Sequence, residues 1–322
     1  MKVLITIDVE ITLPLSGRWR ESRLADEIAR DVNGELSDGV FGLPYQLGLL
    51  KSYGLRATAF VESLFAREVG VEPLRGIIGM IQANGHEAQP HLHPEWLARM
   101  SKPILPERTG RCLSDFSQAE QDTLIAECLR LFRAAGASPY AFRAGNWAFN
   151  IDTLRALKRN GIIYDSSYNI SFLVPQCRAG MPVSLLGPEL IEGIWEIPLS
   201  YANCLSGPRP AQLCACSAGE MQSALRGARE AGQYAFVIVL HSFELMHRTT
   251  DIRRPNHPCH VLVRRFERLC RFLADNREEF PTVWFSDLPT DRMPAGYHKP
   301  APRISSYQTI WRYAEQLASR VM

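Results

Sequence analysis

Two carboxylates follow an apolar run near the start of the chain, in the stretch Thr-Ile-Asp8-Val-Glu10. Side chains two residues apart in an extended strand point to the same side, so Asp8 and Glu10 would share one face. One of them could act as a base and the other could ligate a metal ion. The alternative is that this stretch is only the solvated end of a strand.

Three histidines occur within eight residues further along the chain, at His86, His91 and His93. His91 and His93 can face the same way in extended chain, which is a common way to bring two imidazoles to one cation. Pro94 suits the first turn of a following helix, so Glu95 would lie close by. The pattern predicts metal binding by His91 and His93. We expect His86 to hold the strand through a hydrogen bond instead.

Three more polar groups stand at the ends of predicted strands. Arg143 could grip a carboxylate with two hydrogen bonds and keep it ionised and oriented; the alternative is a surface salt bridge. His241 closes the most apolar strand and is a candidate proton donor, the alternative being a core histidine with satisfied hydrogen bonds. Asp165 could fix the tautomer of His241 and raise its pKa.

The elements that must position these groups are repeated β-α units. Apolar, β-branched runs alternate with stretches of helical period, which indicates an α/β fold with a parallel sheet. Strands are predicted at residues 3–7, 57–61, 87–91, 141–142, 162–164, 194–197, 235–240 and 282–285. Helices are predicted at residues 41–52, 74–83, 117–135, 151–160, 220–230 and 261–275. Seven or eight such units would close a single barrel over residues 1–288, followed by an extension at 289–322.

Three segments interrupt this pattern, at residues 14–39, 167–192 and 200–217. Loops that follow strands build the active sites of α/β barrels, so we expect these segments to shape a substrate pocket. The extension carries apolar residues at helical spacing, namely Ile304, Tyr307, Ile310, Trp311, Ala314 and Leu317. We expect this amphipathic helix to pack on the barrel or on another subunit, which makes a homo-oligomer possible.

Composition excludes several classes of protein. A net charge of +2 over 322 residues does not indicate a nucleic-acid surface. No apolar run approaches the length of a membrane-spanning helix, and the apolar start is too short for a secretory signal. The eight cysteines have no framework spacing, and the Cys214–Cys216 pair lacks a second pair at zinc-finger distance, so free thiols are expected. We therefore expect a cytoplasmic protein.

In their order along residues 2 to about 288, these five motifs resemble the polysaccharide deacetylase family, also called carbohydrate esterase family 4. That family includes chitin and peptidoglycan deacetylases. The resemblance implies a distorted (β/α) barrel that binds zinc or a similar divalent ion through an acid and two histidines. It also implies that Asp8 is the general base, braced by Arg143, that His241 is the general acid, partnered by Asp165, and that His91 is the first metal histidine.

The sequence departs from the family pattern in two places. Val9 stands where the family has a second aspartate, and the next carboxylate is Glu10, to which we assign the metal-ligand role. The family also spaces its metal histidines four residues apart, but the fourth residue after His91 is Glu95. Either His93 replaces that histidine or Glu95 ligates directly. The set we take is Glu10, His91 and His93, with one divalent ion, zinc.

The expected function is hydrolysis of an N-acyl group, N-acetyl in the first place, from an amino sugar in a cytoplasmic glycan precursor or oligosaccharide. The metal and backbone N–H groups around residues 146–147 would stabilise the oxyanion. One alternative is an amidohydrolase for a non-sugar small molecule. Another is a catalytically inactive carbohydrate-binding barrel, which would have no need for a matched acid and base. The remaining alternative is a purely structural metal or a hydrogen-bonded core network.

Overall fold

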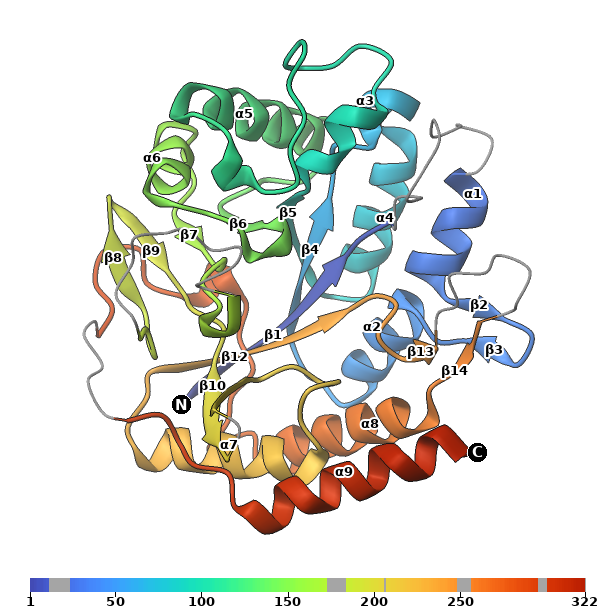
Figure 1. Cartoon of the computed structure of the whole chain (residues 1–322), viewed down its shortest axis with the longest axis vertical. Coiled ribbons are helices and arrows are strands. Elements are labelled where there is room, and N and C mark those ends of the chain that lie inside the picture. Colours follow the sequence, from blue (N-terminus) through green and yellow to red (C-terminus); the bar gives the residue numbers. More distant parts are fainter. Residues whose placement is uncertain (12–23, 173–183, 206, 248–255, 295–299, 322) are drawn as a thin grey trace.

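A curled sheet of eight strands forms the centre of the protein, with helices along its outer side (Figure 1). The computed structural model describes residues 1–11, 24–172, 184–205, 207–247, 256–294 and 300–321, with side chains to residue 315 in the last helix. Across the sheet the order is β12-β1-β4-β5-β6-β7-β9-β8. Neighbours are parallel except β8 and β9. The strands are β1 (Lys2–Val9), β4 (Ala57–Glu62), β5 (Glu87–Leu92), β6 (Ala141–Ala144), β7 (Tyr164–Asp165), β8 (Glu189–Ile191), β9 (Ile194–Glu196) and β12 (Ala235–His241).

The helices follow the strands in alternation, as the sequence predicts. The longer ones are α2 (Leu43–Ser52), α4 (Glu72–Ala83), α5 (Gln118–Ala134), α6 (Ile151–Arg159), α7 (Ala218–Glu230), α8 (His260–Asp275) and α9 (Ser306–Val321). Short elements include α1 (Leu24–Glu27), a π-helical turn (Ile28–Asn33), α3 (Ala66–Val69) and the hairpins β2 (Glu35–Leu36) with β3 (Gly39–Val40), β10 (Tyr201–Cys204) with β11 (Gly207–Pro210), and β13 (Met246–His247) with β14 (His257–Pro258). The α/β class and the mostly parallel, curled sheet are thereby confirmed.

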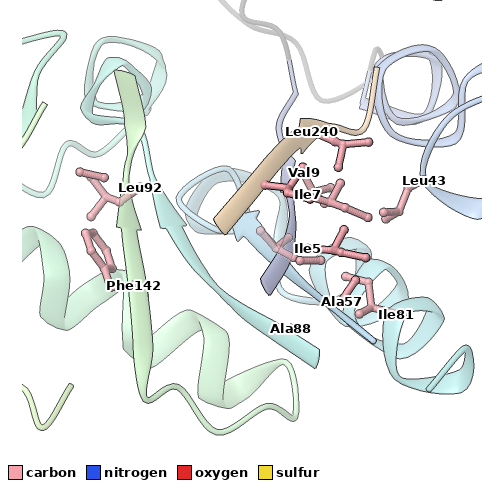
Figure 2. Close-up of a cluster of buried hydrophobic side chains, with 14 of the residues drawn as sticks. Ile5, Ile7, Val9, Leu43, Ala57, Ile81, Ala88, Leu92, Phe142 and Leu240 are labelled. Carbon is pink, nitrogen blue, oxygen red and sulfur yellow. The ribbon is translucent and has the colours of Figure 1, made fainter. Parts of the chain in front are cut away.

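The side chains of β1 alternate between two buried layers. Ile5 and Ile7 belong to the core between sheet and helices, on the side of Leu43 of α2 (Figure 2). Leu4 belongs to a second cluster on the opposite, concave side of the sheet. Because alternate residues of a strand share a face, Asp8 lies on the concave side with Leu4. The alternation of side chains along β1 therefore places the carboxylate of Asp8 on the concave side of the curled sheet.

The sheet is curled rather than closed by regular pairing among the described residues. Its outer strands in the order above are β12 and β8. Ser200 and residues 211–213 lie along the free edge of β12, where Val239 N donates to Ala211 O at 3.0 Å and Ser200 N donates to Val237 O at 3.2 Å. An irregular segment thus covers the edge that a further parallel strand would occupy in a complete barrel.

Two local predictions are wrong. Residues 282–285 form no strand: Thr282 makes a single bridge to Val3, and the chain then enters the 3-10 helix Phe285–Asp287. The carboxylate of Glu87 accepts hydrogen bonds from the backbone N–H groups of Phe285 and Ser286, so these donors are not available for pairing between strands. Residues 167–192 and 200–217 are not simply loops, because they contain β8 and the β10–β11 hairpin. Residues 12–23, in the predicted insert 14–39, and residues 173–183 lie outside the described residues.

The C-terminal helix α9 packs on the protein with the face that the sequence did not predict. Tyr307, Ile310 and Trp311 are 74%, 65% and 62% exposed, whereas Thr309 and Arg312 are buried. Polar residues of α9 pair with buried charges on other helices: Glu315 pairs with Arg265 of α8, and Arg312 approaches Glu220 of α7, which Arg209 also pairs with. Contact of the exposed apolar face with another subunit, and the division at residue 288, stay predictions.

Two predictions from composition can be compared with the structure. No helix among the described residues is long and apolar enough to cross a membrane. All seven described cysteines are free thiols, as their spacing predicts.

Candidate active site and metal centre

The register of the parallel strands gathers the predicted site residues at one end of the sheet. Asp8 on β1 is paired with His241 on β12, and His91 on β5 is paired with Arg143 on β6. Between them, Glu62 at the end of β4 is paired with His91. Because all these strands are parallel, their carboxyl ends lie together, which is where α/β barrels carry their chemistry.

Glu10, His91 and His93 bring three ligand atoms together. Nε2 of His91 and Nε2 of His93 are each 3.1 Å from Oε1 of Glu10, and the two nitrogens are 3.1 Å from each other. Zinc bonds of roughly 2.0–2.1 Å in tetrahedral geometry put ligand atoms about 3.3 Å apart. The spacing and the chemical types of these atoms therefore fit one divalent ion such as zinc.

The far nitrogen of each histidine is held by an acceptor. Nδ1 of His91 is 2.8 Å from the backbone oxygen of Arg143, and Nδ1 of His93 is 3.2 Å from Oε2 of Glu95. Carbonyl and carboxylate oxygens only accept, so each Nδ1 must carry a proton. In the neutral ring this leaves the lone pair on Nε2, directed at the cluster, which is the arrangement of metal-ligating histidines.

Glu95, the other candidate ligand, lies behind His93 rather than among the ligand atoms. One of its oxygens meets Nδ1 of His93, and the other accepts a hydrogen bond from Nδ2 of Asn146 at 2.9 Å. The structure thus groups His93 with Glu10 and His91, and places Glu95 where it orients the ring of His93.

The charged groups of the cluster shift one another's pKa values. Burial raises the pKa of Glu10, but the charge of His93 and hydrogen bonds from both histidines bring it well below its ordinary value. Burial lowers the pKa of His93, but the carboxylates of Glu10, Glu95 and Glu62 together raise it well above its ordinary value. A cation that binds these atoms must therefore displace a proton from His93.

Asp8 and Arg143 form a buried ion pair beside this cluster. Nη1 of Arg143 donates to Oδ1 of Asp8 at 2.6 Å, and the guanidinium is fully buried. The predicted two-pronged grip is wrong, because only Nη1 reaches Asp8: Nη1 also donates to Thr6, and Nε and Nη2 donate to Ser166. The surface salt bridge considered as an alternative is also wrong. Arg143 offsets the charge of Asp8 and fixes the position of one of its oxygens.

His241 is paired with Glu244, three residues further along the chain. Oε2 of Glu244 lies 3.1 Å from Nδ1 of His241 and accepts from its backbone N–H at 3.0 Å. Oε1 of Glu244 accepts from the N–H of Cys214 at 2.6 Å. Burial lowers the pKa of His241, but the hydrogen bond with Glu244 and the charge of Glu10 outweigh it and raise the pKa to about 9. His241 is therefore protonated at neutral pH.

The predicted pairing of Asp165 with His241 is wrong. Asp165 is fully buried on β7, where its Oδ1 accepts from Ser167 Oγ at 2.7 Å and its carboxyl group faces Glu196. Burial and the charge of Asp165 raise the pKa of Glu196 well above its ordinary value, so Glu196 can hold a proton between the two groups. No hydrogen bond between Asp165 and His241 exists among the described residues. β7 is five places from β12 in the sheet, and Glu244 is near His241 in sequence.

A cavity of about 200 Å³ opens on these groups. It is lined by the base, ligand and acid candidates Asp8, Glu10, His91 and His241, and by Ala144, Asn146, Trp147, Phe172 and Gln212. Two of the ligand candidates, Glu10 and His91, therefore face the same open cavity as the base and acid candidates. Asn146 and Trp147 both have φ of 56°, in the left-handed region, so the chain turns sharply at this wall.

Two other polar residues of β4 and β5 and their ends have structural contacts that the sequence only partly indicated. His86 does make a hydrogen bond, but its Nε2 meets the carbonyl of Leu47 in α2 rather than its own strand. Glu62 was not predicted at all: burial raises its pKa to about 7, and its carboxylate binds the backbone at His93. A charged residue at the end of the apolar run 57–61 was the available signal.

Comparison with known proteins finds solved structures of similar fold. No protein-family model matches the chain, and no curated protein sequence matches it. A solved structure classed as a polysaccharide deacetylase from Mycobacterium smegmatis is similar with a TM-score of 0.54 and 18% identity, over 87% of this chain and 85% of that one. A 4-alpha-glucanotransferase from Thermococcus litoralis has a TM-score of 0.51 and 11% identity, over 89% of this chain and 40% of that one. A family 4 carbohydrate esterase from Streptomyces lividans has a TM-score of 0.42 and 13% identity, over 88% and 91%.

The resemblance to polysaccharide deacetylases is thus confirmed at the level of the fold. The curled, mostly parallel sheet is the distorted barrel that the resemblance implied.

Proposed function

We propose that the protein is a divalent-metal-dependent hydrolase that removes an N-acyl group, in the first place N-acetyl, from an amino sugar. The observation that carries this proposal is the convergence of Glu10 Oε1, His91 Nε2 and His93 Nε2 within 3.1 Å of one another. A binding-only protein would not need such a ligand set beside a carboxylate base and a protonated histidine. Zinc is the ion we propose, because two imidazoles and a carboxylate suit it.

The cation would supply Lewis-acid chemistry, polarising an acyl carbonyl and making a water molecule more acidic. Asp8 would then take a proton from that water. One oxygen of Asp8 is held by Arg143, which orients the carboxylate so that the other oxygen can accept the proton. Asp8, Glu10 and His91 all line the cavity, so the base stands beside the proposed ligands.

His241 would deliver the second proton. An amine is a poor leaving group unless it is protonated as the carbon–nitrogen bond breaks. Because Glu244 engages Nδ1, the proton on Nε2 of His241 is the one free to move. Backbone N–H groups of Asn146 and Trp147, at the sharply turned wall, are the proposed partners of the developing oxyanion.

The residues that line the cavity favour a small acyl group as the part of the substrate that enters it. Trp147 and Phe172 add aromatic side chains to a cavity that the ionisable groups also line. A sugar ring outside an N-acetyl group could pack its apolar face against such aromatic side chains. The proposed substrate is therefore an oligosaccharide or glycan precursor that contains an N-acetylated amino sugar.

The volume of about 200 Å³ also supports a second candidate, hydrolysis of a non-sugar small-molecule amide. Zinc-loaded protein incubated with N-acetylglucosamine oligomers and, separately, with simple acetamides separates the two, with acetate release as the readout. The proposal expects release from the oligomers, loss of release on chelation, and recovery when zinc is added back. Release from the acetamides alone would support the second candidate, and release from neither substrate would overturn both.

A further inference from the structure

Glu62, at the end of β4, binds the backbone on both sides of the gap between β4 and β5. Its Oε1 accepts a hydrogen bond from the N–H of Leu64 at 2.6 Å, and its Oε2 accepts from the N–H of His93 at 2.6 Å. The side chain is only 1% exposed. Both oxygens of a buried carboxylate are therefore committed to main-chain donors, and one of these belongs to a proposed metal ligand.

The backbone around His93 has few other means of attachment to β4. β5 ends at Leu92, so His93 lies beyond the regular strand. Pro90 and Pro94 have no N–H group to donate. Glu62 thus supplies a partner for a backbone donor that regular pairing does not reach.

The ring of His93 is restrained at two further points. Its Nδ1 meets Glu95, and its flat side lies against Gly145, where an added Cβ would come within 2.6 Å of the ring. With Glu62 on the main chain, the residue is held at its backbone, at its far nitrogen and across its ring. Only Nε2 is left to face Glu10 and His91.

We propose that Glu62 is a positioning residue for the metal centre, fixing the main chain at His93 so that its imidazole meets Glu10 and His91. This inference rests on the proposed function, because it assumes that these three residues hold a cation. Glu62 acts through the backbone and is not itself a ligand.

The substitution Glu62→Gln tests this with little change in size. An amide has one accepting oxygen, and its NH₂ group would face a backbone donor, so one of the two hydrogen bonds must break. Loss of a group that orients a metal ligand typically lowers affinity about 10- to 100-fold. We expect that reduction in zinc affinity, measured by competition with a chromophoric chelator.

Glu87→Gln is the matched control. Glu87 stands at the start of β5, the opposite end from the metal centre, and also binds main-chain donors, at Phe285 (3.1 Å) and Ser286 (3.4 Å). The same chemical change there removes the same kind of contact without touching His93. We expect both variants to be destabilised in thermal unfolding, but zinc affinity to fall only in Glu62→Gln.

The outcomes are distinct. Wild-type affinity in Glu62→Gln, or an equal loss in Glu87→Gln, overturns the positioning role. If Glu62→Gln does not fold, Glu62→Asp decides: its shorter side chain keeps the charge but cannot span both donors, so zinc affinity should again fall, together with a changed visible spectrum when cobalt replaces zinc. An Asp variant with wild-type affinity and spectrum overturns the inference. Absence of zinc binding in the wild type would instead remove the proposed metal centre itself.

Discussion

Replacing Glu244 by Gln should move the pH range in which the protein is active. Glu244 is the nearest carboxylate to Nδ1 of His241, at 3.1 Å, and is the main influence that raises the pKa of His241 from 6.5 to about 9 against the effect of burial. Gln keeps the size and an accepting oxygen but removes the charge. The pKa of His241 should therefore fall toward its ordinary value or below it.

The size of the effect follows from the two pKa values. At pH 8 roughly nine-tenths of His241 is protonated if its pKa is about 9, and about 3% if its pKa is 6.5. An enzyme that needs the protonated form should lose activity by about 30-fold at pH 8 in Glu244→Gln, and far less at pH 6. A bound cation offsets the charge of Glu10 and so lowers the starting pKa, which makes the loss smaller than about 30-fold for a variant whose pKa is 6.5.

The assay is kcat against pH for zinc-loaded wild type and Glu244→Gln, with a titration of the His241 ring by NMR as an independent readout. Asp165→Asn is the control, because Asp165 is the partner that the family resemblance implied. We expect the basic limb of the kcat–pH profile of Asp165→Asn to stay at the pH of the wild type. A basic limb that stays put in Glu244→Gln, or that shifts down in Asp165→Asn, would refute the pairing of His241 with Glu244.

Three further predictions concern the same site. Asp8→Asn should lower turnover by ~10²–10⁴ while zinc stays bound, since a base is lost but no ligand; full activity on any wild-type substrate would contradict this. His241→Ala should be slow on amides but less damaged on aryl acetate esters, whose leaving group hardly needs a proton; equal losses would count against His241 as the acid. Zinc binding should release a proton and weaken as pH falls, because His93, with its raised pKa, must deprotonate first; calorimetry in two buffers of different ionisation enthalpy measures this.

Local patterns in the sequence were sufficient to find most of the groups that line the cavity. The spacing of Asp8 and Glu10 at the end of β1, and of His91 and His93 at the end of β5, is short-range information, and the structure does bring these four side chains together. Strand order then follows from repeated β-α units, because parallel strands place their carboxyl ends at one edge.

The partner of His241 could not be found in the same way. Several carboxylates follow strands in this sequence, and the distance between β7 and β12 depends on how far the sheet curls. Glu244 is three residues from His241, but it lies in a turn whose geometry has no periodic signal. The structure shows that this turn brings its carboxylate back to both the ring and the backbone of His241.

The sequence pattern of α9 did not predict which face of the helix packs on the protein, and the reason is electrostatic. An amphipathic pattern predicts that the apolar face packs inward. Here Arg265 on α8 is buried and requires an anion, which Glu315 of α9 supplies at 2.9 Å from Nε. Arg312 likewise approaches the buried Glu220 on α7. Charged residues on α7 and α8 influence which face of α9 packs. The sequence of α9 alone holds no signal of those charges.

The zinc content of four purified proteins tests the central claim most directly: wild type, His91→Ala, His93→Ala and Glu95→Gln. If Glu10, His91 and His93 hold the cation, elemental analysis should find one zinc per wild-type chain and little zinc in either histidine variant. Glu95→Gln should keep its zinc, because that side chain meets only the far nitrogen of His93. Zinc lost from Glu95→Gln but kept in His93→Ala would contradict the ligand set, and a wild-type chain that binds no zinc or other divalent ion would contradict the metal centre as a whole.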